Sequence, residues 1–542
     1  MAPHLAVQLL VAVGGVVLYA VANKWKCRYT NLRYVPKAPG GHWLWGHEWM
    51  IFVSPDSRCL REWFDQFKTG ILGIKGSLMH PDILAIRDPA ALTYIFTKNS
   101  TNWPKSPYVA PLIERSIGRG LVWSEGELHK LQRQASTPFF NNDSIRRMDP
   151  VMRETGDKFV VILNDHIERS RSVMDFNGAV QINAIDWMNK AIMDITGKVA
   201  FGYDFKFGMA PEAELILKVL LEMNRTRQSP GGFVAPLVLR AFPFITSLPM
   251  ESIQAEGEVK TTTKELGRRL LRERKLLDEN GDARGHDYLS ALRNMYNVHT
   301  EDSIELDGIL DQIATLIVAA QENSPSTLAH ILYALAHDKD AQNRLRQELL
   351  SFSSTSLEGE PTYAEYQTQL PFLDAVLKEI LRLHPTTGWS ERVALEDDVL
   401  PLNVPIRDGS GKEVKFVDVK AGQVVVVPHL AINRSNEVFP DPDEFRPERW
   451  LTSPPSPDKM MPKGWNGLAT FIEGPHICIG LRLALHEIRV LLSTLVKNFE
   501  FLPVEGPNGK VEDLLGATLR TFIVGRREDG PCIPVMIRPI HA

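Results

Sequence analysis

The sequence predicts a mainly α-helical protein with a small β region, preceded by one N-terminal transmembrane helix. From Leu60 onward, apolar residues recur mostly with helical periodicity. Two short apolar runs, Ile83–Ile86 and Val424–Val427, interrupt this pattern and are typical of buried strands. At the N-terminus, Leu5–Ala22 is an uncharged apolar run of about 18 residues, long enough to cross a bilayer as a helix. The chain has 542 residues, 44% of them hydrophobic, and can therefore bury a large core.

The charges that flank the apolar run predict its orientation. Lys24, Lys26 and Arg28 follow it, and no lysine or arginine precedes it. Because basic flanks stay in the cytosol, we expect the rest of the chain on the cytosolic side. The alternative is a cleaved signal peptide with Ala20–Ala22 as the cleavage site, but such peptides carry their basic residues ahead of the apolar run.

The chain is expected to form one catalytic domain behind this anchor. Pro36, Pro39, Gly40 and Gly41 predict a stiff connector without helix. Beyond it we find neither an internal repeat nor a Ser/Gly-rich linker. The expected organisation is therefore an anchor over residues 1–23, a basic and proline-rich linker over 24–45, and a catalytic domain over 46–542.

Charge and cysteine content exclude two classes of protein. The net charge of −5 argues against a nucleic-acid partner. The four cysteines are widely scattered, which favours a reducing compartment over a disulfide framework, and no Cys-x-x-Cys pair is present. They are Cys27, Cys59, Cys478 and Cys532.

Several local patterns organise the globular part. Pro89–Thr97 is predicted to be a short helix, and Trp103–Ser124 an irregular loop that could form a pocket wall. The sequence Ser229-Pro230-Gly231-Gly232 should break the helical pattern between two apolar segments. His129 and Arg133 lie four positions apart, so they share one helix face and could grip a carboxylate. A solvated basic face is the alternative for this pair.

Leu306–His337 predicts a long helix that is apolar on nearly all faces and should cross the centre of the domain. Its middle nevertheless carries Glu322, Asn323 and Ser324, and burying a carboxylate or amide without a partner is costly. Pro325 cannot donate a hydrogen bond to the carbonyl of residue 321, so the helix should kink there. The alternative is that one helix ends at Ser324 and another begins at Pro325.

Two later segments carry the remaining charged candidates. Glu379 and Arg382 are three residues apart on one predicted helix face, a spacing that by itself indicates only a helical ion pair. Arg392 precedes a strand-like stretch, and Arg449 lies in the loop Phe445-Arg446-Pro447-Glu448-Arg449-Trp450.

One cysteine stands between two glycines, directly before a long apolar helical pattern. Gly474 and Gly480 allow a tight turn and a close approach to a bulky ligand, and amides at a helix start stabilise the Cys478 thiolate. A buried structural cysteine is the alternative. The pattern Phe-x-x-Gly-x-x-x-Cys-x-Gly over Phe471–Gly480 resembles the cysteine loop of the cytochrome P450 family, in which the thiolate is the axial ligand of heme iron.

Other segments resemble this family in the family's order along nearly the whole chain. The resemblance implies a P450 fold and heme b ligated by Cys478. It also implies a buried structural network of Glu379, Arg382 and Arg449, and an oxygen-activating segment that includes Glu322, Asn323 and Ser324. The residues expected at the heme propionates are His129, Arg133, Arg392 and His476. In the family, His129 is usually Trp, His476 is usually Arg, Ala320 is usually Gly and Asn323 is usually Thr.

The resemblance further implies a monooxygenase that inserts one oxygen atom from O2 into an apolar small molecule. Electrons would come from NADPH through NADPH-cytochrome P450 reductase, docked on the cysteine side. A terpenoid or other secondary metabolite is the expected substrate class, by analogy with fungal relatives. Ser229–Gly232 lies where the family has a lid over its substrate channel, although an ordinary surface turn fits equally. The expected location is the endoplasmic reticulum membrane, single-pass, with the catalytic domain in the cytosol.

Three other functions remain open at this point. Because Asn323 replaces the proton-delivering Thr, the enzyme could be a reductase-independent hydroperoxide isomerase or dehydratase. We expect the monooxygenase instead, with Ser324, or a water held at the carbonyl freed by Pro325, supplying protons. A Cys-His hydrolase using Cys478 and His476 is a remote alternative, because a histidine two residues away on a loop is not an obvious base. A purely structural membrane protein is disfavoured by the buried polar motifs.

Overall fold

The computed structural model describes residues 31–78, 80–170, 178–242, 245, 257–279, 287–296, 304–355, 359–407, 410–452, 461–516 and 518–540. The expected anchor, residues 1–23, and the first part of the expected linker lie outside these ranges. Within them, no helix combines the length and the hydrophobicity that crossing a membrane requires.

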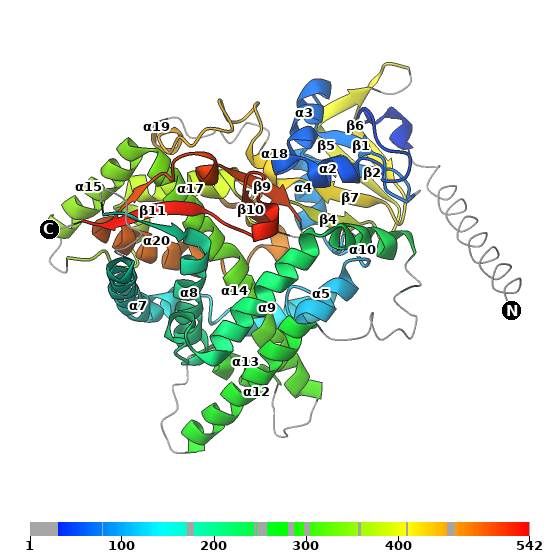
Figure 1. Ribbon diagram of the computed structural model, residues 1–542. Helices are drawn as coiled ribbons and strands as arrows, with labels where there is room; N and C mark the ends of the chain where they lie inside the picture. The colour runs from blue at the N-terminus through cyan, green and yellow to red at the C-terminus, as the bar shows by residue number, and fades with distance from the viewer. Residues whose placement is uncertain are drawn as a thin grey trace, which may run out of the picture.

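Most of the described chain is helical, as predicted. In Figure 1 the helices fill the left and lower parts of the molecule around the central helix α14 (Ile304–His337). The helices packed against α14 include α8 (Ala184–Thr196), α12 (Glu258–Glu279), α13 (Tyr288–Tyr296), α15 (Lys339–Thr355), α17 (Pro371–Leu383) and α20 (Leu481–Asn498). Helices α6 (Gly126–Ser136), α7 (Asn142–Arg169) and α9 (Pro211–Gln228) complete this region. The largest hydrophobic core lies among these helices.

The main sheet lies at the upper right of Figure 1. Its strand order is β1-β2-β7-β4, formed by Ile71–Ile74, Ile83–Ile86, Val424–Val427 and Ser390–Val393. All residues of β2 and β7 are buried, as expected for continuous apolar strands. A hairpin of β5 (Asp398–Arg407) and β6 (Glu413–Val419) lies in the same region, with the short helices α2 (Glu48–Val53), α3 (Arg58–Phe67) and α4 (Pro89–Thr93).

Two smaller β units lie beside the helices. Strands β3 (Val180–Asn183), β11 (Pro534–Pro539) and β8 (Phe499–Leu502) form one antiparallel sheet in that order. Strands β9 (Val511–Leu515) and β10 (Leu519–Ile523) form a separate hairpin. A mainly helical fold with small sheets is therefore confirmed.

The central helix is continuous across Pro325, so the alternative of two helices meeting at Ser324 is wrong. Side chains next to the proline bond to the helix backbone. Asn323 Nδ2 donates to the Ala319 carbonyl at 2.7 Å, and Thr327 Oγ1 donates to the Asn323 carbonyl at 3.2 Å. A proline inside a helix is tolerated where tertiary packing stabilises both flanks.

Other local predictions are corrected in detail. The segment 103–124 is not wholly irregular, because it contains the helix α5 (Ala110–Ile117). Pro111 lies in the first turn of this helix, a position that proline favours. The helix predicted over Pro89–Thr97 ends as α-helix at Thr93 and continues as one wider π-type turn, Tyr94–Lys98. The predicted break at Ser229 is present: α9 ends at Gln228, and Ser229 Oγ accepts the Gly232 amide at 3.1 Å to cap α10 (Pro230–Ala241).

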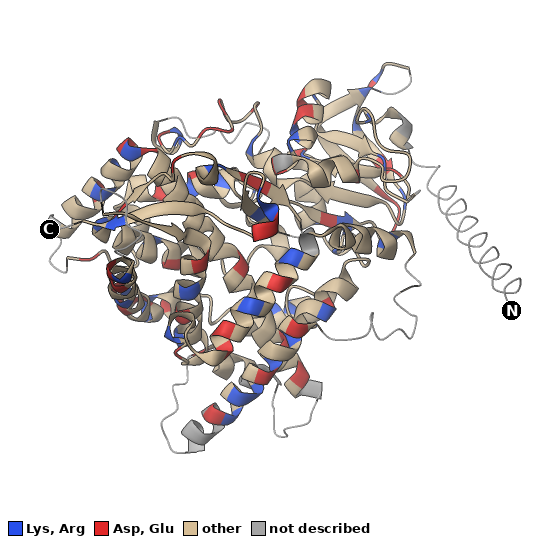
Figure 2. Ribbon diagram, viewed as in Figure 1, with Lys and Arg blue, Asp and Glu red and all other residues tan. Residues whose placement is uncertain are grey.

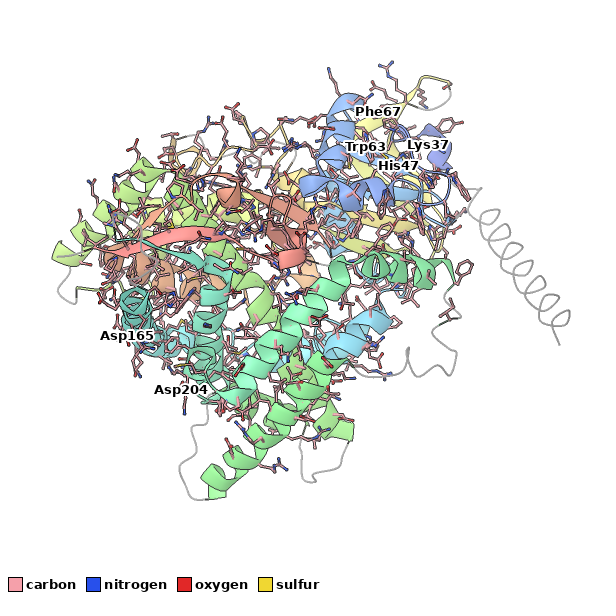
Figure 3. The ribbon with its side chains drawn as sticks, viewed as in Figure 1. Lys37, His47, Trp63, Phe67, Asp165 and Asp204 are labelled. Carbon is pink, nitrogen blue, oxygen red and sulfur yellow. The ribbon has the colours of Figure 1, made fainter. Side chains whose placement is uncertain are left out.

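The described part of the expected linker packs against the main sheet. The Pro36 carbonyl accepts the Gly73 amide at 2.8 Å, and the Ala38 amide donates to the Gly73 carbonyl at 3.0 Å. Lys37 and His47 lie in this region together with Trp63 of α3 (Figure 3), and the His47 and Trp63 rings are 5.2 Å apart. Residues near 35–38 therefore belong structurally to the sheet region.

Charge is mixed on the visible surface. In Figure 2, acidic and basic residues alternate along the exposed parts of α9 and α12 rather than forming a field of one sign. This agrees with the small net charge of −5.

Candidate active site

The cysteine loop delivers one thiol to the start of α20. The turn Gly474–His476 precedes it, the Cys478 amide donates to the Phe471 carbonyl at 3.1 Å, and Gly480 is the residue before the helix. Gly474 has φ +72°, and a Cβ there would lie 2.0 Å from the Phe96 carbonyl oxygen. Only glycine fits this close approach, so the loop is fixed by backbone geometry.

The Cys478 thiol is accessible but poorly hydrated. It is exposed, yet burial raises the pKa of its thiol, against the opposing effect of the Gly480 amide and the Arg133 charge. Protein atoms surrounding the thiol disfavour its ionised form even though a small probe can still reach the sulfur. This arrangement suits a soft-metal ligand that is ionised only when the metal binds.

Two of the predicted propionate-binding residues pack against each other beside this loop. The His129 ring on α6 lies 4.0 Å from the ring of His476, and His476 Nε2 forms a 3.1 Å ion pair with Glu125. One turn along α6, Arg133 Nη1 donates to the Ile477 carbonyl at 2.7 Å, next to Cys478. Burial and then the His476 charge lower the pKa of His129 to about 4, so His129 can serve as a neutral hydrogen-bond donor.

Arg392 completes the group from strand β4. Its side chain is buried, and burial lowers its pKa to about 10. It lies over the Phe96 ring, and its backbone pairs with that of Lys105. Lys105 Nζ contacts Glu125 at 3.1 Å. Sequence reasoning missed Lys105 and Glu125, although Trp103-Pro104-Lys105 and the residue before α6 flank motifs that it did identify.

These charges do not balance within the described residues. Lys105, Arg133 and Arg392 are three cations, and among the described residues only the Glu125 carboxylate forms an ion pair with any of them or with His476. Burial opposes ionisation of Glu125, but its hydrogen bond from His476 and the Lys105 charge lower its pKa to about 2. Excess positive charge beside an accessible thiol fits heme, whose two propionate carboxylates would pair with the cations while its iron meets the sulfur.

One face of α14 is accessible in the middle of an otherwise buried helix. Asn323 is exposed, and Leu316, Ala319 and Ala320 are partly exposed, while their neighbours are buried. This spacing places the four residues on one helix face. The accessible face lies on a helix that other helices pack against, so it is the part of α14 open to a small molecule.

Glu322 and Ser324 point elsewhere. Glu322 forms a buried 2.8 Å ion pair with Arg520 of β10, which also donates to Asn224 Oδ1 at 3.0 Å. Ser324 Oγ donates to Glu487 of α20, and burial raises the pKa of Glu487 to about 7. The structure therefore does not bring the three residues predicted for oxygen activation to one face: Asn323 alone is accessible.

The charged network predicted for α17 is assembled in the interior. Arg382 donates to both Glu379 oxygens at 2.9 and 2.7 Å, and Arg449 Nε donates to Glu379 at 2.9 Å. The Trp450 Nε1 and the Arg446 backbone amide also donate to Glu379, at 2.9 and 3.0 Å. Burial opposes ionisation of Glu379, but the hydrogen bonds and charge of Arg382, followed by Arg449, lower its pKa.

This network also reaches the cysteine loop through Asn433. Arg382 Nη1 donates to the Asn433 carbonyl at 3.3 Å. The Asn433 side chain accepts the Ala469 amide and donates to Thr470 Oγ1, both at 2.8 Å. Ala469 and Thr470 directly precede the loop at Phe471. The ion pairs thus help to position the segment that carries Cys478.

Comparison with known proteins agrees with this geometry. The family model for cytochrome P450 matches residues 74–521. The chain is 32% identical to cytochrome P450 monooxygenase claQ of Ampulloclitocybe clavipes over 465 residues, covering 84% of each chain. It is 28% identical to cytochrome P450 monooxygenase 205 of Postia placenta over 562 residues, covering 99% of each chain.

Proposed function

Because this chain belongs to the cytochrome P450 family and is a monooxygenase of that family, we propose that it inserts one oxygen atom from O2 into an apolar small molecule, with electrons from NADPH through a reductase. The observation that carries the proposal is the accessible, poorly solvated Cys478 thiol beside a surplus of cations. Among the described cysteines, Cys478 is the one that lies beside this cluster of cations.

The family binds heme through a cysteine thiolate, and Cys478 is the residue suited to that role here. Arg133, Arg392 and the His129–His476 pair would hold the propionates, with Lys105 adding a further cation. When bound, heme supplies the activation of O2. The protein's own residues bind and orient the substrate, limit access of water and hold the groups that deliver protons.

We propose an apolar substrate, of which a terpenoid or other secondary metabolite is the class to test first. Leu316, Ala319 and Ala320 give the accessible face of α14 a largely apolar character next to Asn323. An apolar face excludes water from the reacting group and binds a hydrocarbon skeleton by burial.

The proposed reaction is tested by turnover with isotopically labelled oxygen. Heme-loaded protein should require NADPH, a reductase and O2, and should place one atom of 18O2 into the product. Turnover of a hydroperoxide without reductase, and with no label from 18O2, would establish the isomerase or dehydratase instead. The hydrolase has less support, because His476 is engaged with Glu125 and His129.

Asn323 is proposed to anchor a water for proton delivery. Its Nδ2 is used within the helix at 2.7 Å, which leaves Oδ1 to accept from a water in the accessible space. Replacing Asn323 by Leu should raise the peroxide released per NADPH several-fold. Replacing Ser324 by Ala, the matched control, should have a smaller effect because its hydroxyl bonds to Glu487. A larger effect at Ser324 would assign proton delivery to the Ser324–Glu487 pair.

We also propose that the protein is anchored in the endoplasmic reticulum membrane with its catalytic domain in the cytosol. The apolar run Leu5–Ala22 and its one-sided basic flank support this. Deleting residues 2–28 should release much of the protein from membranes while heme binding persists. A secreted protein whose mature N-terminus lies at or just after Asn23 would identify a signal peptide and reject the anchor.

A further inference from the structure

Three potential metal ligands meet away from the cysteine loop. His330 comes from α14, His384 follows the end of α17, and Asp513 lies on β9; these elements are labelled in Figure 1. One ligand atom from each residue lies within 4.8 Å of the others. Their side chains are 3%, 23% and 7% exposed, respectively. The cluster is thus an interior site that no part of the proposed reaction uses.

Asp513 is a buried carboxylate without a permanently charged partner among the described residues. It accepts Thr521 Oγ1 at 2.6 Å and His384 Nδ1 at 2.7 Å, and His330 Nε2 lies 3.5 Å away. No lysine or arginine forms an ion pair with it in the described chain. Buried anions are normally paired with a cation or bound to a metal.

The orientation of His330 turns its second ring nitrogen, Nε2, toward this carboxylate. Its Nδ1 lies 2.7 Å from the Ser326 carbonyl, which can only accept, so Nδ1 carries the hydrogen. In the neutral ring, Nε2 is then an acceptor facing Asp513 and Thr521 Oγ1, the latter at 2.8 Å. The Thr521 hydroxyl has one hydrogen, so it can donate to Asp513 or to His330 Nε2 but not to both. A ring whose second nitrogen donates to a backbone carbonyl is the usual arrangement of a metal-binding histidine.

We propose that His330, His384 and Asp513 bind a divalent transition-metal ion, with zinc as the first candidate. Two imidazoles and one carboxylate form a donor set typical of zinc. Bonds of about 2.0–2.2 Å from His330 Nε2 and Asp513 would meet at roughly 110–120°, close to tetrahedral, across their 3.5 Å separation. The rings of His330 and His384 are now stacked at 4.1 Å and 20°, so His384 must tilt to bring a nitrogen onto the ion.

Such an ion would join three separate segments. It would tie the β9–β10 hairpin to α14 and to the end of α17, and so stabilise the folded state over the unfolded chain. The alternative to a metal ion is a proton on His330 Nε2, which would also neutralise the negative charge of Asp513. The experiment therefore has to distinguish bound metal from a protonated His330.

The test uses full-length, heme-loaded protein, so that Cys478 is occupied and cannot take up zinc. Calorimetric titration with zinc chloride should show one site, and the melting temperature should rise with zinc. His330→Gln should weaken zinc binding by at least about 100-fold and remove the zinc-dependent shift. The control is His337→Gln, which changes an exposed histidine of the same helix whose Nδ1 similarly contacts a backbone carbonyl, that of Tyr333, at 2.9 Å.

A second variant, Asp513→Asn, should lose zinc binding in the same way. If Asp513→Asn does not accumulate as folded protein, the result for His330→Gln decides the question. No zinc uptake by the unaltered protein, or equal uptake by His330→Gln and the unaltered protein, would overturn the proposal. In that case the cluster holds a proton. The test does not depend on turnover, so a failed monooxygenase assay leaves it unaffected.

Discussion

Cys478→Ser is expected to abolish thiolate ligation of heme. An alcohol is neither soft nor readily ionised, so it cannot replace the sulfur anion on iron. The reduced, carbon monoxide-bound protein should therefore lose the red-shifted Soret band that thiolate ligation produces. The loss should be complete, because Cys478 is the cysteine that lies beside the cation cluster.

The matched control for this variant is Cys532→Ser. Cys532 is a partly buried free cysteine, and burial raises the pKa of its thiol to about 11, so it is a poor source of thiolate. Cys532→Ser should keep the band. If Cys478→Ser kept it as well, or the unaltered heme-loaded protein lacked it, the ligand assignment would be wrong.

Arg382→Ala is expected to prevent accumulation of heme-loaded protein rather than merely slow turnover. Arg382 is 0% exposed and donates to Glu379 and to the carbonyls of Asn433 and Pro442. Its removal leaves a buried carboxylate with fewer donors, at a cost of roughly 3–5 kcal/mol. It also loosens Asn433, which positions the residues directly before the cysteine loop. The measurement is the heme content and melting temperature of the purified protein.

The control is Arg446→Ala, in the same loop as Arg449. The Arg446 side chain is 43% exposed, and its one ion pair within the described chain is with Asp441 at 3.3 Å. Its backbone amide, which an alanine retains, donates to Glu379. Exposed pairs contribute little, so this variant should fold and load heme normally. Stable, fully loaded Arg382→Ala protein with normal activity would show that the network is dispensable.

Short-range sequence patterns predicted the central helix and the buried strands, because each of these elements is encoded within one short stretch of the chain. The all-round apolar run at Leu306–His337 specifies a buried helix by periodicity alone, and α14 runs from Ile304 to His337. Continuous apolar runs likewise predicted β2 and β7. The i to i+3 spacing of Glu379 and Arg382 guaranteed that they share a face, but only the family resemblance brought Arg449 to them.

The direction of single side chains was decided by packing. Sequence placed Glu322, Asn323 and Ser324 side by side, yet each helical residue is turned by about 100° from the last, so neighbours face different surroundings. Glu322 meets Arg520 and Ser324 meets Glu487, which leaves Asn323 on the accessible face. The partners lie far along the chain, and no periodicity relates them.

The sequence by itself therefore determined the mainly helical class, the central helix and the loop that presents Cys478, because short-range spacing and backbone sterics control these features. Only the tertiary structure decided which distant groups meet. It brought Lys105 to Glu125 near Arg392, and His330 and His384 to Asp513. Such meetings depend on how helices and hairpins pack, since burial selects the whole arrangement and the buried charges then find partners within it.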